Sequence, residues 1–307
     1  MTTTPTAPVD TAGFEFVASY WTIAGDARLR MFGGTDYSPI DLRQRIETAA
    51  ATGYAGVGFH SADLLHWADR HPPTEVTRIL AGNGLGIVEL EILREWFVTG
   101  EPRAESDAVR QQLLRLCEEL PVTHLKVGSS FGPEHFPAEH IATEFAALCL
   151  QFADVGTRVG LEAIPNAHLR TPAEVLEVVE LADPPNGGLI LDTWHGFRGH
   201  VPYPSLRDIP AARIVSVEVA DGAAEPVVDL ANDGCNHRQL IGEGAFGTRD
   251  WLAAILETGY AGHIGVENLS EENRRRPLPA EAYDNLAAAA REFAPLSGRM
   301  GANRSGR

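Results

Sequence analysis

Apolar positions in this chain cluster into eight short runs that are separated by longer amphipathic stretches. Runs of this length, bounded by polar or glycine-containing segments, predict β-strands. The predicted strands lie at residues 13–22, 55–60, 85–93, 124–128, 158–165, 189–191, 213–221 and 263–269. They recur at a nearly regular spacing along the chain, which indicates one repeating structural unit.

Most of the intervening segments show helical periodicity. Helices are predicted at residues 41–54, 73–81, 104–120, 137–155, 172–182, 248–259 and 279–293, with a short one at 205–211 and an irregular segment at 222–247. Apolar strands alternating with helices predict a parallel sheet covered by helices, and eight such units predict an α/β fold, a closed (β/α)8 TIM barrel. A doubly wound sheet is the alternative, but no G-x-G-x-x-G turn follows the first strand.

We expect the barrel to be a single domain over residues 13–296. Residues 1–12 are rich in threonine and proline and are predicted to be disordered, without the pattern of a signal peptide. Residues 297–307 are small and basic and are predicted to form a disordered tail.

Charge and cysteine content narrow the functional classes. The 307-residue chain has a formal net charge of −17, which argues against nucleic acid and against an anionic membrane surface as partners. No apolar run is long enough to span a bilayer. The three cysteines, Cys117, Cys149 and Cys235, lack paired spacing, so we expect free thiols in a cytoplasmic protein.

The segment LILDTWHGFRG holds the clearest chemical signal. A short apolar run ends at Asp192, and His195 follows three residues later. A carboxylate at the mouth of a buried strand needs a cation or hydrogen bonds. The pair is therefore a candidate metal or proton-transfer site; the structural alternative is that Asp192 caps the next helix.

Three other predicted strands carry a glutamate near their ends: Glu162, Glu218 and Glu267. In a barrel these ends meet at one rim, where the active site lies. Bare carboxylates there would repel one another, and a divalent cation would remove the conflict. Oxygen ligands favour Mg²⁺ or Mn²⁺, and a nearby imidazole would admit Co²⁺ or Zn²⁺. Separate salt bridges or helix caps are the alternative.

The phrases GLEAIPN, LILDTWH, VEVADG, RQLIGEG and GYAGHIGVENLS resemble the sugar phosphate isomerase/epimerase superfamily, the xylose-isomerase-like TIM barrels. The resemblance implies a metal held by Glu162, Asp192, the residue at 218 and Glu267. Family members usually place histidine, and some glutamine, at that third position, whereas this chain has Glu218. An all-carboxylate set favours Mn²⁺, with Mg²⁺ and Co²⁺ as alternatives.

Other residues are candidates for the same rim. By resemblance, His195 contacts substrate or moves a proton, and Arg238 binds substrate; the alternative for Arg238 is a salt bridge to Asp221. Lys126 is the only lysine in the chain and lies inside an apolar strand, so it is either paired with an acid or catalytic. His60, Glu91 and Trp21 are further candidates for substrate binding.

The chemistry expected of such a site is proton abstraction next to a carbonyl, through a metal-bound enediolate, with Glu162 and Glu267 as candidates for both ligand and base. We therefore expect an isomerase or epimerase of a keto-sugar or cyclitol. Alternatives are a lyase, either a dehydratase of the inosose or dehydroshikimate type or a 3-keto-glycoside deglycosidase, and a sugar-binding barrel without catalysis. No phosphate-binding segment is evident. Relatives are often dimers or tetramers, and the sequence does not define an interface.

Overall fold

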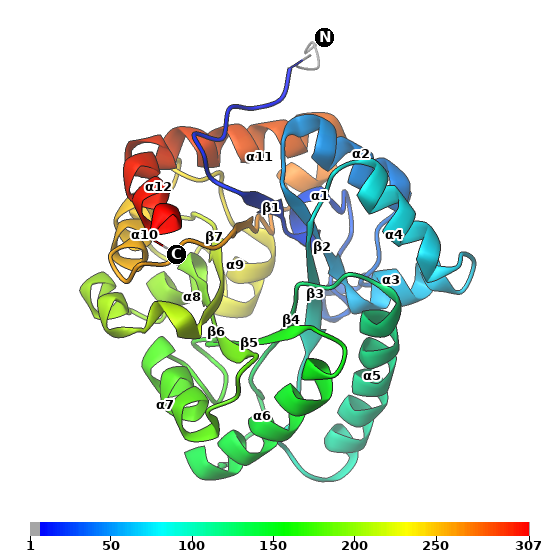
Figure 1. Cartoon of the computed structure of the whole chain (residues 1–307), viewed down its shortest axis with the longest axis vertical. Coiled ribbons are helices and arrows are strands. Elements are labelled where there is room, and N and C mark those ends of the chain that lie inside the picture. The colour runs from blue at the N-terminus through cyan, green and yellow to red at the C-terminus, as the bar shows by residue number, and fades with distance from the viewer. Residues whose placement is uncertain (1–6, 307) are drawn as a thin grey trace.

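Eight parallel strands pair in chain order and close into a barrel (Figure 1). The computed structural model describes residues 7–306. The strands are β1 (Phe16–Ala18), β2 (Gly56–His60), β3 (Ile87–Leu93), β4 (His124–Val127), β5 (Arg158–Glu162), β6 (Gly187–Asp192), β7 (Ile214–Val219) and β8 (Ile264–Val266). The pairing of β8 with β1 closes the barrel, which confirms the predicted fold.

Helices surround the strands (Figure 1). They are α1 (Tyr20–Ile23), α2 (Leu42–Thr52), α3 (Ser61–Ala68), α4 (Pro73–Gly82), α5 (Gly100–Glu119), α6 (Ala138–Ala153), α7 (Pro172–Ala182), α8 (Thr193–Arg198), α9 (Leu230–Asn236), α10 (Thr248–Leu256), α11 (Leu278–Phe293) and α12 (Ser297–Ser305). Five 3₁₀ turns complete the described fold: Arg30–Phe32, Tyr203–Asp208, Ala211–Arg213, Asn273–Arg275 and Ala294–Leu296. No helix in the described part of the chain is long and apolar enough to cross a membrane.

Local sequence explains where several helices begin. Asp41 precedes α2, and its carboxylate accepts hydrogen bonds from the backbone N–H groups of Arg43 and Gln44. Thr171 and Glu174 form a reciprocal capping box at the start of α7. Such side chains satisfy backbone donors that have no partner within the helix.

The main apolar core lies between the strands and the helices. The interior of the barrel is instead strongly polar, whereas many barrels of this kind fill it with branched apolar side chains. Side chains that are almost fully buried along the strands include Glu89, Glu91, His124, Lys126, Glu162, Asp192, Ser216 and Glu218. The barrel interior therefore holds buried polar and ionisable side chains along the length of the strands.

The two chain ends correct the predictions of disorder. Residues 297–305 form α12, where Met300 is buried and the Arg304 guanidinium lies 2.6 Å from the Glu15 carboxylate. Those contacts stabilise α12 against the rest of the fold, and they cannot be predicted from the composition of the segment. Residues 1–6 lie outside the described residues, but the Val9 N–H donates to the Thr52 carbonyl at 2.9 Å, so residues 7–12 are in part attached to the barrel.

Four helices also correct the predictions. Residues 20–23, which were placed in the first strand, form α1; residues 61–68 form α3 directly after β2, and residues 193–198 form α8 directly after β6. The segment expected to be irregular contains α9. Its sequence, LANDGCN, has poor intrinsic helix propensity, and the Asp229 carboxylate stabilises its start by accepting from the Asn232 N–H at 3.0 Å.

Candidate active site at the carboxyl ends of the strands

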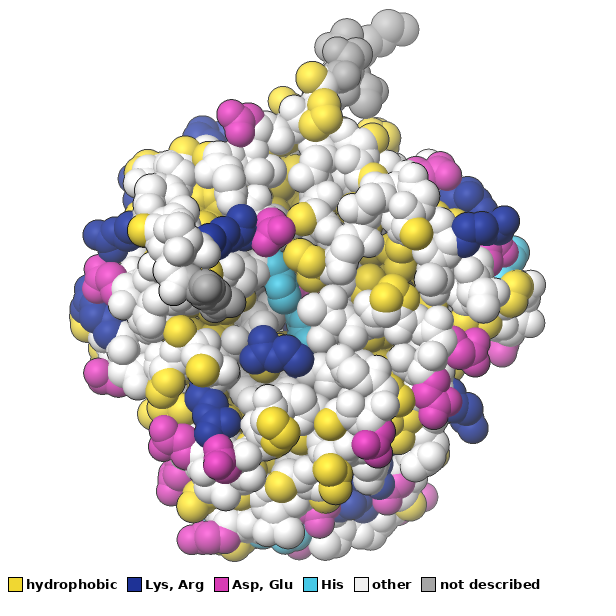
Figure 2. Space-filling view, viewed as in Figure 1, with side chains coloured by type: hydrophobic (Ala, Val, Ile, Leu, Met, Phe, Trp, Pro, Cys, Tyr) yellow, Lys and Arg dark blue, Asp and Glu magenta, His cyan; other side chains and the backbone are white. Residues whose placement is uncertain are grey.

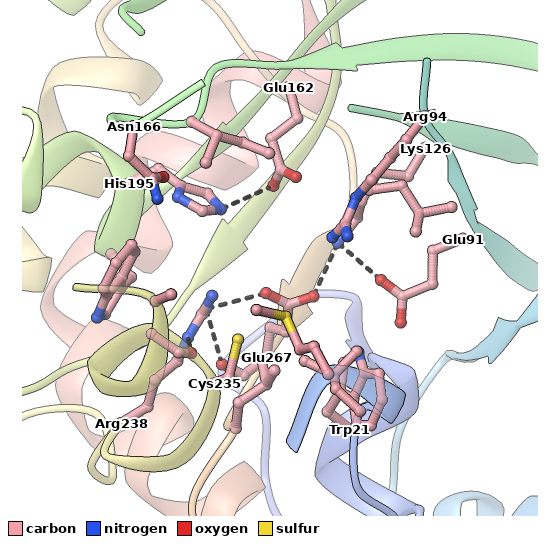
Figure 3. A pocket seen from close by; sticks show the side chains of 18 of the residues that line it. Trp21, Glu91, Arg94, Lys126, Glu162, Asn166, His195, Cys235, Arg238 and Glu267 are labelled. Atoms are coloured by element: carbon pink, nitrogen blue, oxygen red, sulfur yellow. Dashed lines mark hydrogen bonds and ion pairs between the residues drawn. The ribbon is translucent and has the colours of Figure 1, made fainter. Parts of the chain in front are cut away.

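A cavity of about 410 Å³ opens at the carboxyl ends of the strands (Figure 3). All eight residues predicted for catalysis or substrate binding line it: Trp21, His60, Glu91, Lys126, Glu162, His195, Arg238 and Glu267. Asp192 and Glu218, predicted only as metal ligands, do not line the cavity; each is ion-paired with a cation that does. The fold thus gathers these ten side chains from six strands, two helices and two loops.

Lys126 stands at the centre of three carboxylates. Its Nζ lies 2.6 Å from Glu218 Oε1, 2.8 Å from Glu267 Oε1 and 3.2 Å from Glu91 Oε2. Burial would lower the pKa of Lys126, but the carboxylates of Glu218 and Glu267 hold it well above its usual value. The ammonium group therefore stays charged, so it can donate hydrogen bonds but cannot accept a proton from a substrate.

Arg238 bridges the other side of the site. Its Nη1 lies 2.9 Å from Asp192 Oδ2 and 2.9 Å from Glu267 Oε2, and its Nε donates to the Gly234 carbonyl at 2.9 Å. Burial would raise the pKa of Asp192, but the Arg238 guanidinium and His195 hold it well below its usual value. Asp192 is therefore ionised throughout the neutral range.

The alternative partner proposed for Arg238, Asp221, is engaged elsewhere. Its two carboxylate oxygens accept from the backbone N–H groups of Gly222, Gly242 and Phe246 at 2.9–3.0 Å. Asp221 therefore holds the loop between β7 and α10, and the alternative of an Arg238–Asp221 salt bridge is wrong.

His195 and Glu162 point toward each other at one side of the cavity (Figure 3), with 3.6 Å between His195 Nε2 and Glu162 Oε1. His195 belongs to the first turn of α8, where its backbone N–H donates to Asp192 Oδ1 at 3.0 Å. Asp192 therefore caps this helix, as the structural alternative held, while it also pairs with Arg238. Helix capping fixes the distance between the imidazole and the carboxylates.

Negative charge exceeds positive charge at the base of the cavity. Glu91, Glu162, Asp192, Glu218 and Glu267 face two cations, Lys126 and Arg238. Burial, followed by the charge of Glu267, raises the pKa of Glu218 well above its usual value, and burial raises that of Glu91 to about 7. The site is therefore short of positive charge.

Several carboxylate oxygens there have no hydrogen-bond partner among the described residues: Glu91 Oε1, Glu162 Oε1 and both oxygens of Glu218. Lys126 lies 2.6 Å from Glu218 Oε1, an ion pair whose angle does not suit a hydrogen bond. Ligand atoms of Asp192, Glu218 and Glu267 lie within 4.8 Å of one another, as do those of Glu162, Asp192 and His195. By charge and donor type, these residues fit a divalent cation.

His60 and several unpredicted residues complete the wall. Burial lowers the pKa of His60 to about 4, so its ring is neutral and packs beside Trp21 with 5.5 Å between ring centroids. Arg94 and Asn166 also line the cavity and were not predicted, although each follows shortly after a predicted strand. Apolar side chains from segments remote in sequence also line it, among them Met31, Phe131 and Leu230.

Comparison with known proteins agrees with the barrel fold. The model of the family described as xylose isomerase-like TIM barrel matches residues 46–295. The chain is 29% identical over 248 residues to a 3-dehydroshikimate dehydratase of Pseudomonas putida, covering 80% of this chain and 39% of that protein. It is 25% identical over 248 residues to a 2-oxo-tetronate isomerase of Haemophilus influenzae, covering 75% of this chain and 89% of that protein.

The fold also resembles solved structures. A xylose isomerase-like TIM barrel/4-hydroxyphenylpyruvate dioxygenase fusion protein superposes with a TM-score of 0.77 at 24% identity, over 90% of this chain and 42% of that one. An IOLI protein with a bound zinc atom gives a TM-score of 0.76 at 16% identity, over 94% and 99% of the two chains. The chain spans about two-fifths of the length of the dehydratases that it matches.

Proposed function

This chain belongs to the xylose isomerase-like TIM barrel family, and we propose from that premise that it is a divalent-metal-dependent enzyme that removes a proton next to a carbonyl group. The substrate we propose is a ring-shaped keto acid without phosphate, from which a hydroxyl group is then expelled. The observation that carries this proposal is the carboxylate excess beneath the cavity, where Glu162 forms no ion pair with Lys126 or Arg238 and its Oε1 lies 3.6 Å from His195 Nε2.

Glu162 is the group we assign to proton abstraction. Glu267 is ion-paired with both Lys126 and Arg238, at 2.8 and 2.9 Å, so each of its two oxygens is already engaged with a cation. Glu162 lines the cavity, where its Oε1 lies 3.6 Å from His195 Nε2. A carboxylate so placed can accept a proton from a bound substrate, and His195 can pass a proton to the leaving hydroxyl.

The ion would be held by Glu162, Asp192, Glu218 and Glu267, and Mn²⁺ is the one we propose, because all four donors are carboxylates. When bound, a divalent ion supplies positive charge to the oxygen on which negative charge develops. Lys126 and Arg238 position these carboxylates and offset part of their mutual repulsion.

The position of Arg94 favours a substrate that has a carboxylate group. It lines the cavity, is exposed, and forms no ion pair among residues 7–306, whereas Lys126 and Arg238 are both paired with acids. Its guanidinium lies 5.6 Å from the Phe131 ring centroid. A planar guanidinium suits bidentate carboxylate binding, and the similarity to 3-dehydroshikimate dehydratases supports the same class of substrate.

The test uses the chelator-treated full chain reloaded with Mn²⁺ and incubated with 3-dehydroshikimate in deuterated water. We expect loss of the mass of one water, dependent on Mn²⁺, abolished in Glu162→Gln and unchanged in Glu118→Gln, an exposed control. Arg94→Met should raise KM more than it lowers kcat. Turnover that persists in Glu162→Gln would contradict the assignment of the base.

Isomerisation is the second candidate, because the similarity to the 2-oxo-tetronate isomerase covers 89% of that protein. It shares the proton-abstraction step. Deuterium uptake into a keto acid of that size, without loss of water, would favour it over elimination. No metal binding and no deuterium uptake from any keto acid would favour a binding protein instead.

A further inference from the structure

A second cluster of potential metal ligands lies at the opposite end of the barrel from the cavity. Glu89 of β3 pairs in register with His124, the first residue of β4. His263 directly precedes β8. Glu91 and Lys126 stand two residues further along β3 and β4, so the cluster forms a separate layer nearer the amino ends of the strands.

We propose that Glu89, His124 and His263 form a second metal site, for a transition metal such as Zn²⁺, at the amino-terminal end of the barrel. His124 Nε2 and His263 Nε2 each lie 3.7 Å from Glu89 Oε1. Three ligands about 2.1 Å from a tetrahedral Zn²⁺ would be about 3.4 Å apart. A small inward movement of the side chains would complete that geometry.

Three imidazole nitrogens of this cluster are buried and lack hydrogen-bond partners among the described residues. His124 is fully buried, and neither of its ring nitrogens has a hydrogen-bond partner in the described part of the chain; the same holds for His263 Nε2. At 3.7 Å these contacts are too long for hydrogen bonds. Buried polar groups without partners are costly, and one cation would satisfy all three ligands together.

Neighbouring residues hold Glu89 in place. The Ser19 hydroxyl donates to Glu89 Oε2 at 3.2 Å, which leaves Oε1 to face the imidazoles, with Ser216 Oγ 3.5 Å away. A Cβ atom at Gly265 would lie 3.4 Å from Glu89 Oε1 and 2.8 Å from Ser19 Oγ, so only glycine leaves the present space. A hydrogen bond to the second oxygen of a ligating carboxylate is common in metal sites.

The imidazoles are in the form that binds metal. Burial lowers the pKa of His124 well below its usual value and that of His263 to about 4, so both rings are neutral and keep a free lone pair. The two cations near these imidazoles already have other partners. Lys126 pairs with three glutamates, and Arg158 contacts the Ile214 carbonyl at 3.5 Å.

Of the three residues in the cluster, His263 lies nearest to solvent. Figure 2 shows histidine side chains at the base of a hollow near the centre of the face on which the chain enters β1. The His263 side chain is 10% exposed and the His124 side chain is not, so an ion entering by this hollow would meet His263 first. Bound there, it would tie β3 and β4 to the chain entering β8.

The experiment compares Zn²⁺ binding to the chelator-treated full chain with binding to His263→Phe and Glu89→Gln. Phenylalanine preserves the ring stacked on His124, and glutamine preserves the shape of Glu89. Loss of outer-shell partners alone costs about 10–100-fold in metal affinity, so loss of a ligand should weaken this site by at least about 100-fold. His135→Phe, at an exposed position, is the control.

We expect wild type to retain one equivalent of Zn²⁺ more than either variant, by plasma mass spectrometry after dialysis. The same difference should appear in a Glu162→Gln background, because that substitution affects only the cavity at the other end. Co²⁺ should give a visible spectrum that responds to the loss of His263. Equal Zn²⁺ content in wild type and both folded variants, or a difference that vanishes in Glu162→Gln, would overturn the proposal.

Discussion

Replacement of Lys126 by methionine tests the charge balance at the centre of the barrel. The ammonium group contacts three buried carboxylates, at 2.6, 2.8 and 3.2 Å. Removing one partner of a buried ion pair leaves an uncompensated charge and costs about 3–5 kcal/mol. At about 2 °C per kcal/mol for a chain of this length, Tm should fall by about 6–10 °C at pH 8.

The loss should depend on pH. Glu91 and Glu218 have folded pKa values raised above the unfolded value of about 4.3, to about 7 for Glu91. Without Lys126 those pKa values rise further, so the folded variant holds protons that its unfolded chain releases. The free energy of unfolding of the variant should therefore fall relative to wild type as pH rises from 5 to 8.

Urea unfolding at pH 5.5 and pH 8, with a chelator present throughout, measures both effects. Arg249→Met is the matched control, because Arg249 pairs with Glu292 at 3.0 Å on the surface with its side chain 47% exposed, where pairs contribute about 0–1 kcal/mol. A Lys126→Met variant that loses no more stability than Arg249→Met, equally at both pH values, would refute the reasoning.

Three further predictions concern the packing of α8, the loop held by Asp221 and a buried carboxyl group in α11. Gly196→Ala should lower the free energy of unfolding by about 1–3 kcal/mol, because the added Cβ would lie 2.2 Å from the Trp251 ring beneath α8. In the control Gly298→Ala in α12, the added Cβ meets nothing within 4 Å, so this variant should be neutral or stabilising in thermal unfolding. Asp221→Asn should cost about 2–3 kcal/mol in urea unfolding, since an amide nitrogen would face backbone N–H donors; equal stability would show that the loop is held otherwise. Burial raises the pKa of Glu281 to about 9. The wild-type protein should therefore lose stability as pH rises from about 4.3 toward 9, because the folded chain keeps a proton that the unfolded chain releases. Glu281→Gln should gain stability over wild type between pH 5 and 8, and a difference in the free energy of unfolding that stays constant with pH would contradict this.

The sequence predicted the barrel because each unit repeats the same strong signals. The β5–α7–β6 region shows this: the predicted bounds of α7 agree with the structure, and β5 begins at the predicted residue. The helices that were missed are short, and their stability depends on neighbours. The α9 segment has poor intrinsic propensity and packs Gly234 closely beneath Trp194, a tertiary contact that no local pattern reveals.

The sequence also indicated which residues would line the cavity, because strand ends meet at one rim of a barrel. It did not reveal the pairing among them. Lys126 and Arg238 both contact Glu267, but these residues lie far apart in the chain and their partners depend on side-chain directions. Glu89, His124 and His263 were overlooked for a related reason, since no motif links three strands at their amino ends.

Solvent deuterium uptake into 3-dehydroshikimate, with and without Mn²⁺, tests the central claim most directly. Wild type loaded with Mn²⁺ should exchange the proton next to the carbonyl and release water, the chelated protein should do neither, and Glu162→Gln should retain Mn²⁺-dependent substrate binding at most. Exchange in Glu162→Gln at the wild-type rate, or none in fully loaded wild type with this or any other keto acid, would contradict the account of the cavity as a proton-abstracting site.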